Sequence, residues 1–206
     1  TPVFSDVMTQ VVVNPNWNVP ESIVQGEFSV AVQEDRDYLA KNKIRIFEGD
    51  AEEAKEIDAG SVNWRDSAEV AKLRFRQDSG EGNALGRIKF LLPNQFNVYL
   101  HDTPSGHLFS RDERSFSHGC VRVENPIALA RYVLDGLPAA REGEIEKLIA
   151  TGETKTLDLP KPLPVHILYF TAFVEDNGGV SFHEDVYGID RDLIGELRTR
   201  SREQAR

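Results

Sequence analysis

The seven residues from Ser117 to Val123 read Ser-His-Gly-Cys-Val-Arg-Val and hold the only cysteine of the 206-residue chain. A cysteine acts as a nucleophile in its thiolate form, which a neighbouring imidazole, guanidinium or aimed backbone N–H group favours. Cys120 has His118 two positions before it and Arg122 two positions after it. Alternate residues of an extended segment point to one side, so His118 and Cys120 are expected to share a face. These residue types therefore allow nucleophilic chemistry at the thiol.

A second imidazole, His101, lies 19 residues before Cys120, at the end of a predicted strand. Either His101 or His118 can act as general base for the thiol once the loop between residues 101 and 117 folds back. Gly119 permits backbone angles that other residues avoid, so the N–H groups flanking Cys120 can point at a developing oxyanion.

Three interpretations of these residues remain open. In the first, Cys120 is a small buried side chain and the histidines are satisfied core groups, the commonest fate of either type. In the second, His101, His118 and Cys120 bind a zinc ion with an open fourth position. His-x-Cys is not a usual chelating pair, however, and neither Cys-x-x-Cys nor His-Glu-x-x-His is present. In the third, the chain is a Cys–His acyl-transfer enzyme.

Composition limits the classes of function. A chain of 206 residues that is 40% hydrophobic can form one sizeable core with a small inserted lobe. The net charge is −10, from 24 Lys and Arg against 34 Asp and Glu, and we expect no nucleic-acid partner because phosphate binding needs a basic face. No run approaches the roughly 18 apolar residues of a membrane span, and no signal-peptide pattern opens the chain. A single cysteine excludes an internal disulfide.

The elements that must position these residues predict an α+β fold that is mainly β. Residues 7–13 are rich in valine, as a strand requires. Residues 87–92 and 97–101 predict a hairpin that ends at His101. The other elements predicted for the core are a strand over residues 73–76, a helix that begins at Asn125-Pro126 and buries one face, and a second short helix that ends at Gly152.

The C-terminal part carries four further expectations. Three prolines between residues 160 and 164 predict an extended connector. Residues 165–174 are almost continuously apolar and predict a central strand covered on both faces. Asn177-Gly178 predicts a type I′ turn that folds the following residues back as a hairpin. The charged tail, residues 199–206, is expected to fray.

Residues 21–67 differ in sequence pattern from the segments around them. Short amphipathic pieces over residues 27–32 and 35–41 alternate with acidic stretches, and residues 43–47 alternate as a small strand does. We interpret this segment as a mobile, mostly helical insertion over the core.

At this point the residues resemble a known family. His101, a spacer of fifteen residues and then Ser117-His118-Gly119-Cys120 resemble the signature of the L,D-transpeptidases, the YkuD-type catalytic domain that remodels bacterial peptidoglycan. The resemblance implies one catalytic domain over residues 1–206, with a mixed, β-sandwich-like core. It is closest to the large periplasmic subclass, whose inserted lid corresponds to residues 21–67. The similar segments are residues 11–20, 82–87, 92–94 and 98–104 and the Tyr-Phe-Thr-Ala run at residues 169–172.

The resemblance implies a role for each residue of the motif. Cys120 corresponds to the nucleophile and His101 to the general base, whose ring the carbonyl of Asp102 would orient. His118 is assigned to the oxyanion side and to holding the loop. Ser117 is expected to hydrogen-bond within the site, and Gly119 and Cys120 to supply backbone donors.

Substrate contacts are also implied. Arg122 stands where the family more commonly has Asn, although Arg is usual in the large subclass. It can favour the thiolate, bind a substrate carboxylate, or pair with an acid as an ordinary strand residue. Tyr99 is expected to line the donor cleft and Trp17 to touch substrate, with packing as the alternative for both. The remaining residues assigned to bracing or lining the cleft are Asp102, Asn83, Arg87 and Arg114.

The implied reaction is attack on the third stem-peptide residue of a tetrapeptide donor, release of D-Ala and transfer to a diaminopimelate amine or water. The implied partners are peptidoglycan stem peptides, with carbapenems as inhibitors and no metal or cofactor. The implied compartment is the periplasm, and we expect a leader and a peptidoglycan-binding module upstream of this chain. Two alternatives stay open: an inactive cell-wall-binding homologue, and a transferase that tethers an outer-membrane protein to peptidoglycan.

Overall fold

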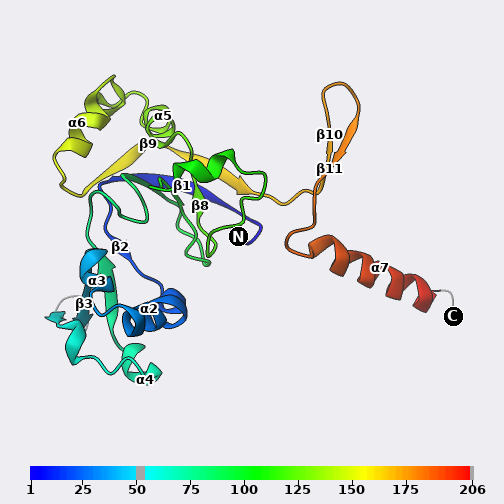
Figure 1. Cartoon of the computed structure of the whole chain (residues 1–206). Coiled ribbons are helices and arrows are strands. Elements are labelled where there is room, and N and C mark those ends of the chain that lie inside the picture. Colours follow the sequence, from blue (N-terminus) through cyan, green and yellow to red (C-terminus); the bar gives the residue numbers. More distant parts are fainter. Residues whose placement is uncertain (50–53, 205–206) are drawn as a thin grey trace.

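The computed structural model describes residues 1–49 and 54–204, and its central element is a five-stranded sheet (Figure 1). The strand order is β8-β7-β6-β1-β9, and neighbours pair antiparallel except β7 and β8, which are parallel. The valine-rich segment forms β1, and the predicted hairpin forms β6 and β7. The bounds are β1 Phe4–Val13, β6 Ile88–Leu91, β7 Leu100–His101, β8 Val121–Arg122 and β9 Lys155–Ile167.

Two helices cover one face of this sheet. The predicted helix after Asn125 is α5, Pro126–Val133, and the second is α6, Glu144–Ala150. A short 3₁₀ turn, η4 Pro138–Ala140, connects them. Alternate strand residues such as Val11, Ile88 and Phe90 are fully buried against these helices. Because successive strand side chains alternate between faces, the residues between them lie on the other face of the sheet.

The segment expected to be a mostly helical insertion contains a sheet of its own. Its strand order is β2-β5-β3-β4, and its two strands β2 and β5 lie outside the expected range of residues 21–67. Residues 50–53 are outside the described part of the chain. The strands are β2 Trp17–Asn18, β3 Ile44–Glu48, β4 Lys55–Ile57 and β5 Arg74–Gln77, and the helical pieces are α1 Glu21–Ile23, the π-helical turn η1 Val24–Phe28, α2 Ser29–Glu34, α3 Tyr38–Lys41, η2 Ala59–Ser61 and α4 Ser67–Val70.

This second sheet, with the helical pieces that pack on it, is called here the second body. It has a separate hydrophobic cluster in which Phe28 and Phe75 are buried, with ring centroids 6.3 Å apart. Within residues 21–67 the helical pieces are longer in total than the strands, as expected, and the small strand expected over residues 43–47 is β3. The sheet was missed because β3 pairs with β5, which lies outside the expected range. Trp17 pairs with Gln77, so the chain enters and leaves the second body at adjacent positions.

The C-terminal part corrects three expectations. The prolines of the expected connector lie within β9, which is an edge strand where proline is tolerated. Residues 165–174 do not form a buried central strand, because β9 ends at Ile167 and β10, Ala172–Val174, is exposed. The hairpin of β10 with β11, Val180–Phe182, is confirmed, but its turn is not type I′, because Gly178 has a positive φ of 81° and Asn177 does not.

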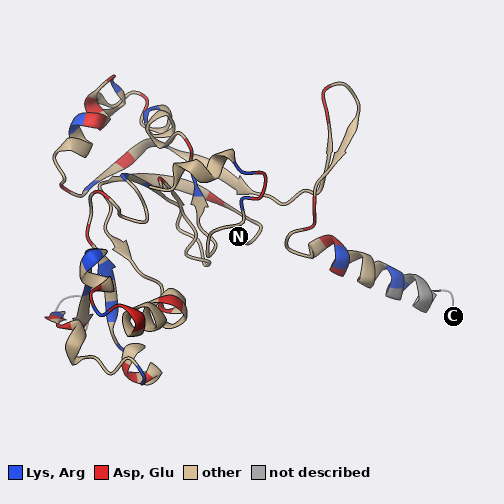
Figure 2. Cartoon of the chain, in the orientation of Figure 1, with Lys and Arg blue, Asp and Glu red and all other residues tan. Residues whose placement is uncertain are grey.

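The chain ends in a helix, α7 Ile189–Gln204, so the backbone expected to fray from residue 199 is helical as far as Gln204. Residues 205–206 lie outside the described part. Figure 1 shows α7 and the β10–β11 hairpin projecting away from the two sheets. Figure 2 shows acidic and basic residues interspersed along α6, α7 and the second body. No helix in the described ranges is both long and apolar enough to cross a membrane.

Candidate active site

Three cross-strand partners form a row on the sheet face opposite α5 and α6. Lys89 of β6 pairs with His101 of β7, and His101 pairs with Arg122 of β8. Directly paired residues point to the same face, so their side chains are neighbours. Tyr99 and Cys120 form the adjacent row, immediately before β7 and β8, and the Val121 N–H donates to the Tyr99 carbonyl at 3.0 Å. The thiol and the imidazole therefore lie diagonally across two parallel strands.

His101 is buried, with 5% of its surface exposed, and its Nδ1 lies 2.5 Å from the Asp102 carbonyl oxygen. A carbonyl only accepts hydrogen bonds, so Nδ1 carries the proton and Nε2 is left as the acceptor. Burial lowers the pKa of His101 to about 4; the Arg122 and Lys89 charges act in the same direction, while the Asp102 contact opposes them. The ring is therefore neutral at pH 7, and the carbonyl expected to orient it does so.

The cysteine loop has the backbone conformation that its glycine permits. Gly119 has a φ of +131°, a region that side chains rarely adopt. Its N–H, expected to face an oxyanion, instead donates to the Ser117 hydroxyl at 3.2 Å. The Cys120 sulfur is partly exposed and lies 3.9 Å from the Asn97 carbonyl oxygen. Among the described backbone groups, none accepts a hydrogen bond from the Cys120 N–H, which leaves that donor available.

Tyr99 links several groups of the site. Burial raises its pKa, and the negative charge of Cys120 and hydrogen bonding to it act in the same direction, while the Trp17 indole opposes them. The hydroxyl therefore stays protonated and can donate. The Lys89 ammonium lies 3.7 Å from the centroid of the Tyr99 ring. Sequence analysis did not single out Lys89, although its position between inward-facing Ile88 and Phe90 places it on the site face.

His118 points toward the second body. Its Nε2 lies 2.9 Å from the Glu27 Oε1 of η1, and more than half of each side chain is exposed. This contact engages one ring nitrogen of His118, and its oxyanion role stays a prediction. Nothing in the sequence connected Glu27 to the site, because the two residues are 91 positions apart.

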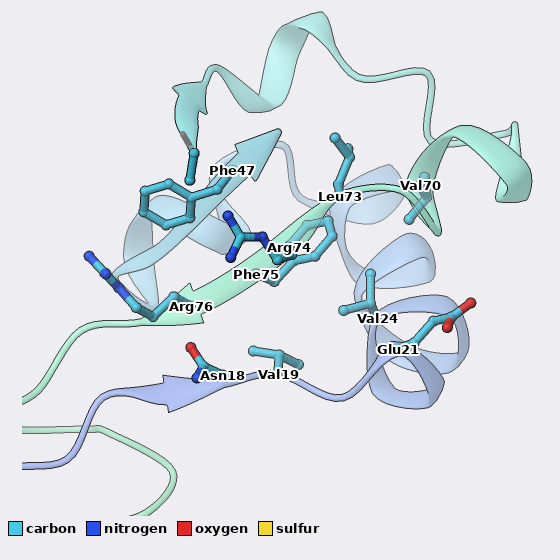
Figure 3. Close-up of a pocket in the computed structure, with 11 residues that line it drawn as sticks. Asn18, Val19, Glu21, Val24, Phe47, Val70, Leu73, Arg74, Phe75 and Arg76 are labelled. Carbon is cyan, nitrogen blue, oxygen red and sulfur yellow. The ribbon is translucent and has the colours of Figure 1, made fainter. Parts of the chain in front are cut away.

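Two cavities meet at Cys120. One, of about 570 Å³, lies between the cysteine loop and the second body; the other, of about 550 Å³, adds Arg114 and Tyr187 to its lining. The first is lined by Trp17, Ile23 and Glu27 on the side of the second body, and by Tyr99, His101, Arg122 and residues 116–120 on the sheet side. A third cavity, of about 410 Å³, lies within the second body around Phe47 and Arg76 and includes none of the predicted site residues (Figure 3).

Three of the predicted residues brace the strands. Asn83 is 1% exposed; its amide donates to the Pro15 and Asp78 carbonyls, so it has no surface to offer a substrate. Asp102 is 8% exposed and accepts from the Arg87 N–H at 2.8 Å, and the Arg87 Nε lies 3.4 Å from the same oxygen. These contacts tie the end of β7 to the start of β6.

The other two arginines differ in their surroundings. Arg114 donates from Nε to the Arg111 carbonyl at 2.8 Å, within the cysteine loop.

The Nε of Arg122 is buried and has no hydrogen-bond partner within residues 1–49 and 54–204. No carboxylate of those residues lies within 4.0 Å of its guanidinium, so the interpretation of Arg122 as an acid-paired strand residue lacks its acid. Arg76 and Arg131 share this feature, and such a donor can be satisfied by water or by an acceptor from outside the chain.

The zinc interpretation requires a cluster of ligands. In the described ranges, no three His, Cys, Asp or Glu side chains are grouped so that they could hold a metal ion. His118, one of the three proposed ligands, contacts Glu27 instead.

Comparison with known proteins agrees with this geometry. The chain is 33% identical over 195 residues to a Haemophilus influenzae protein provisionally named an L,D-transpeptidase. The alignment covers 94% of this chain and 38% of the relative, so the chain spans less than two fifths of that protein's length. Residues 1–156, which include both His101 and Cys120, match the YkuD model, described as the L,D-transpeptidase catalytic domain. The chain therefore belongs to the YkuD family of L,D-transpeptidase catalytic domains.

Proposed function

We propose that this chain is the catalytic portion of a peptidoglycan L,D-transpeptidase in which Cys120 is the nucleophile. The observation that carries the proposal is the paired arrangement of β7 and β8, which sets the thiol beside a buried, neutral imidazole at the mouth of two cavities. A Cys–His pair of this kind is suited to acyl transfer.

In the first half-reaction, His101 Nε2 takes the thiol proton and the Cys120 sulfur attacks the carbonyl of the third stem-peptide residue. The C–N bond to the terminal D-Ala then breaks, and the imidazolium returns the proton to the leaving amine. The oxyanion is assigned to the free Cys120 N–H. The Gly119 N–H also donates to the oxyanion once its hydrogen bond to Ser117 breaks, and the His118 ring does so once its contact with Glu27 breaks.

In the second half-reaction, a diaminopimelate side-chain amine attacks the thioester and loses a proton to His101. The C–S bond breaks, the thiol is restored and a 3–3 cross-link forms. Water in place of the amine yields the tripeptide, which is carboxypeptidase activity.

Substrate placement follows from the two cavities. The unpartnered Arg122 Nε binds a stem-peptide carboxylate, and Trp17 and Tyr99 line the donor side. Arg114 lines the second cavity, which is assigned to the acceptor. The second body acts as the lid over the first cavity. The reaction is assigned to the periplasm. Carbapenems are expected to acylate the Cys120 thiol.

The test is intact-protein mass spectrometry after incubation with a disaccharide tetrapeptide. We expect a covalent adduct equal to the donor without D-Ala, and no adduct in a Cys120→Ala variant whose circular dichroism matches the parent. An adduct that persists in that variant would overturn the nucleophile assignment. The masses of the released products distinguish a cross-linked dimer from a trimmed tripeptide, and absence of any turnover would favour an inactive homologue.

A further inference from the structure

Lys89 is a half-buried cation without a counterion in the described chain. It lies on β6 opposite His101, and no carboxylate of residues 1–49 and 54–204 comes within 4.0 Å of its ammonium. Buried lysines are ordinarily paired, because removing the charge from water is costly. Burial lowers the pKa of Lys89, and the negative charge of Cys120 acts in the opposite direction. Cys120, when ionised, is therefore the group whose charge favours the Lys89 ammonium.

Tyr99 stands between this cation and the thiol. The ammonium sits 3.7 Å from the ring centroid, the geometry of a cation–π contact, and Tyr99 and Cys120 line the same cavity, with β7 between β6 and β8. A cation over the ring withdraws electron density from the phenol, which strengthens its O–H as a donor. Donation to a sulfur anion is stronger than donation to a neutral thiol.

The other ionisable groups around Cys120 are in different states or make other contacts. His101 is neutral at pH 7, and His118 is engaged with Glu27. Arg122 lines both cavities and is open to substrate, whereas Lys89 lines neither of them. A bound stem peptide can therefore recruit Arg122 while Lys89 stays directed at the thiol.

We infer that Lys89 is a positioning residue of this site, whose ammonium stabilises the Cys120 thiolate from behind the Tyr99 ring. The inference deepens the proposed function, since it concerns the same nucleophile. Its measurement does not depend on turnover, because alkylation reports on the thiol itself.

The test is the rate of Cys120 alkylation by iodoacetamide as a function of pH. Cys120 is the chain's only thiol, so the signal has one source. In Lys89→Met, we expect the midpoint of the profile to move up by about one pH unit and the rate at pH 7 to fall about tenfold. The limiting rate at high pH should be unchanged. Lys89→Arg should restore most of the rate, and Lys161→Met, an exposed lysine of β9, should match the parent.

Two results would overturn the inference: a Lys89→Met profile that superimposes on the parent profile, or a loss of rate equal at every pH. Should Lys89→Met fail to fold, Tyr99→Phe keeps the ring and removes only the hydroxyl. That variant is also expected to shift the profile upward, and an unshifted profile would refute the role of Tyr99 as the link. If the parent protein turns over no muropeptide but the Lys89→Met profile is still shifted upward, the proposed function fails and this inference stands.

Discussion

At the scale of single residues, the site depends on side chains held in unusual protonation or hydrogen-bonding states. His101 is kept neutral by burial beside two cations, with its tautomer set by one carbonyl. The Asn83 side-chain amide hydrogen-bonds only to backbone groups: its N–H group donates to the Pro15 and Asp78 carbonyls, and its oxygen accepts from the Leu85 N–H. Each of these two states changes the free energy of unfolding by an amount that can be measured.

The burial of His101 predicts how stability depends on pH. Its pKa is about 4 when folded and near 6.5 when unfolded, so between these values the unfolded chain binds more protons. Stability should therefore fall as the pH drops from 6.5 to 4, by at most about 3 kcal/mol from this group. Urea unfolding of the parent and of His101→Gln across this range should show a flatter dependence for the variant. Parallel curves would contradict the shifted pKa.

Asn83→Ala should destabilise the chain without touching the site. The change leaves the Pro15 and Asp78 carbonyls without their donor in a buried position, at a cost of about 2 kcal/mol. Asn125→Ala is a matched control, since Asn125 is exposed and makes no capping hydrogen bond to α5. Thermal unfolding should separate the two variants, and equal melting temperatures would refute the bracing role of Asn83.

At the scale of elements, the contact between Glu27 and His118 joins η1 to the cysteine loop. Both side chains are largely exposed, and exposed ion pairs contribute little to stability, about 1 kcal/mol or less. The position of this contact matters more, because both residues line the first cavity.

Glu27→Gln is therefore expected to change the rate of acylation by about fivefold or less, with no change in melting temperature. At a pH where His118 is protonated, the effect should shrink as salt is raised, because salt screens exposed charges. Glu34→Gln, an exposed acid of α2, serves as the control. Stopped-flow acylation at two salt concentrations checks this, and a loss of a hundredfold would show that the pair does more than hold the loop.

At the scale of the whole molecule, two hydrophobic clusters divide the chain. The first cluster contains Val11, Phe90 and Leu134, and the second contains Phe28, Ile46 and Phe75. No residue is shared between them, so the first sheet should keep its core without the second body.

Excision of residues 18–76 is expected to leave a folded core that no longer transfers acyl groups efficiently. Trp17 and Gln77 are paired residues of adjacent antiparallel strands, so an Asn-Gly link can join them. A cut within the second body, such as removal of residues 27–58, would instead open its cluster and promote aggregation. Circular dichroism and thermal unfolding of both forms provide the check. If the form lacking residues 27–58 folded and the form lacking residues 18–76 did not, the second body would be required for folding of the first sheet.

The local pattern of the chain singled out Cys120, His101 and Gly119 as candidates and predicted the hairpin that ends at His101, because each depends on neighbours in sequence. The family followed from the same short motif. Hydrophobic periodicity also located α5 and α6, whose buried faces repeat every three to four residues.

Other features depend on partners far along the chain. The apolar run at residues 165–174 reads as a buried strand, but burial requires a covering layer that no local pattern reveals. Lys89 acquires its position from cross-strand register, and Glu27 meets His118 across 91 residues. Periodicity reports which face a residue occupies, whereas register and packing between distant segments decide what that face meets. For this reason the candidate nucleophile and base could be proposed from the sequence, whereas the groups that surround them were found only from the pairing of the strands.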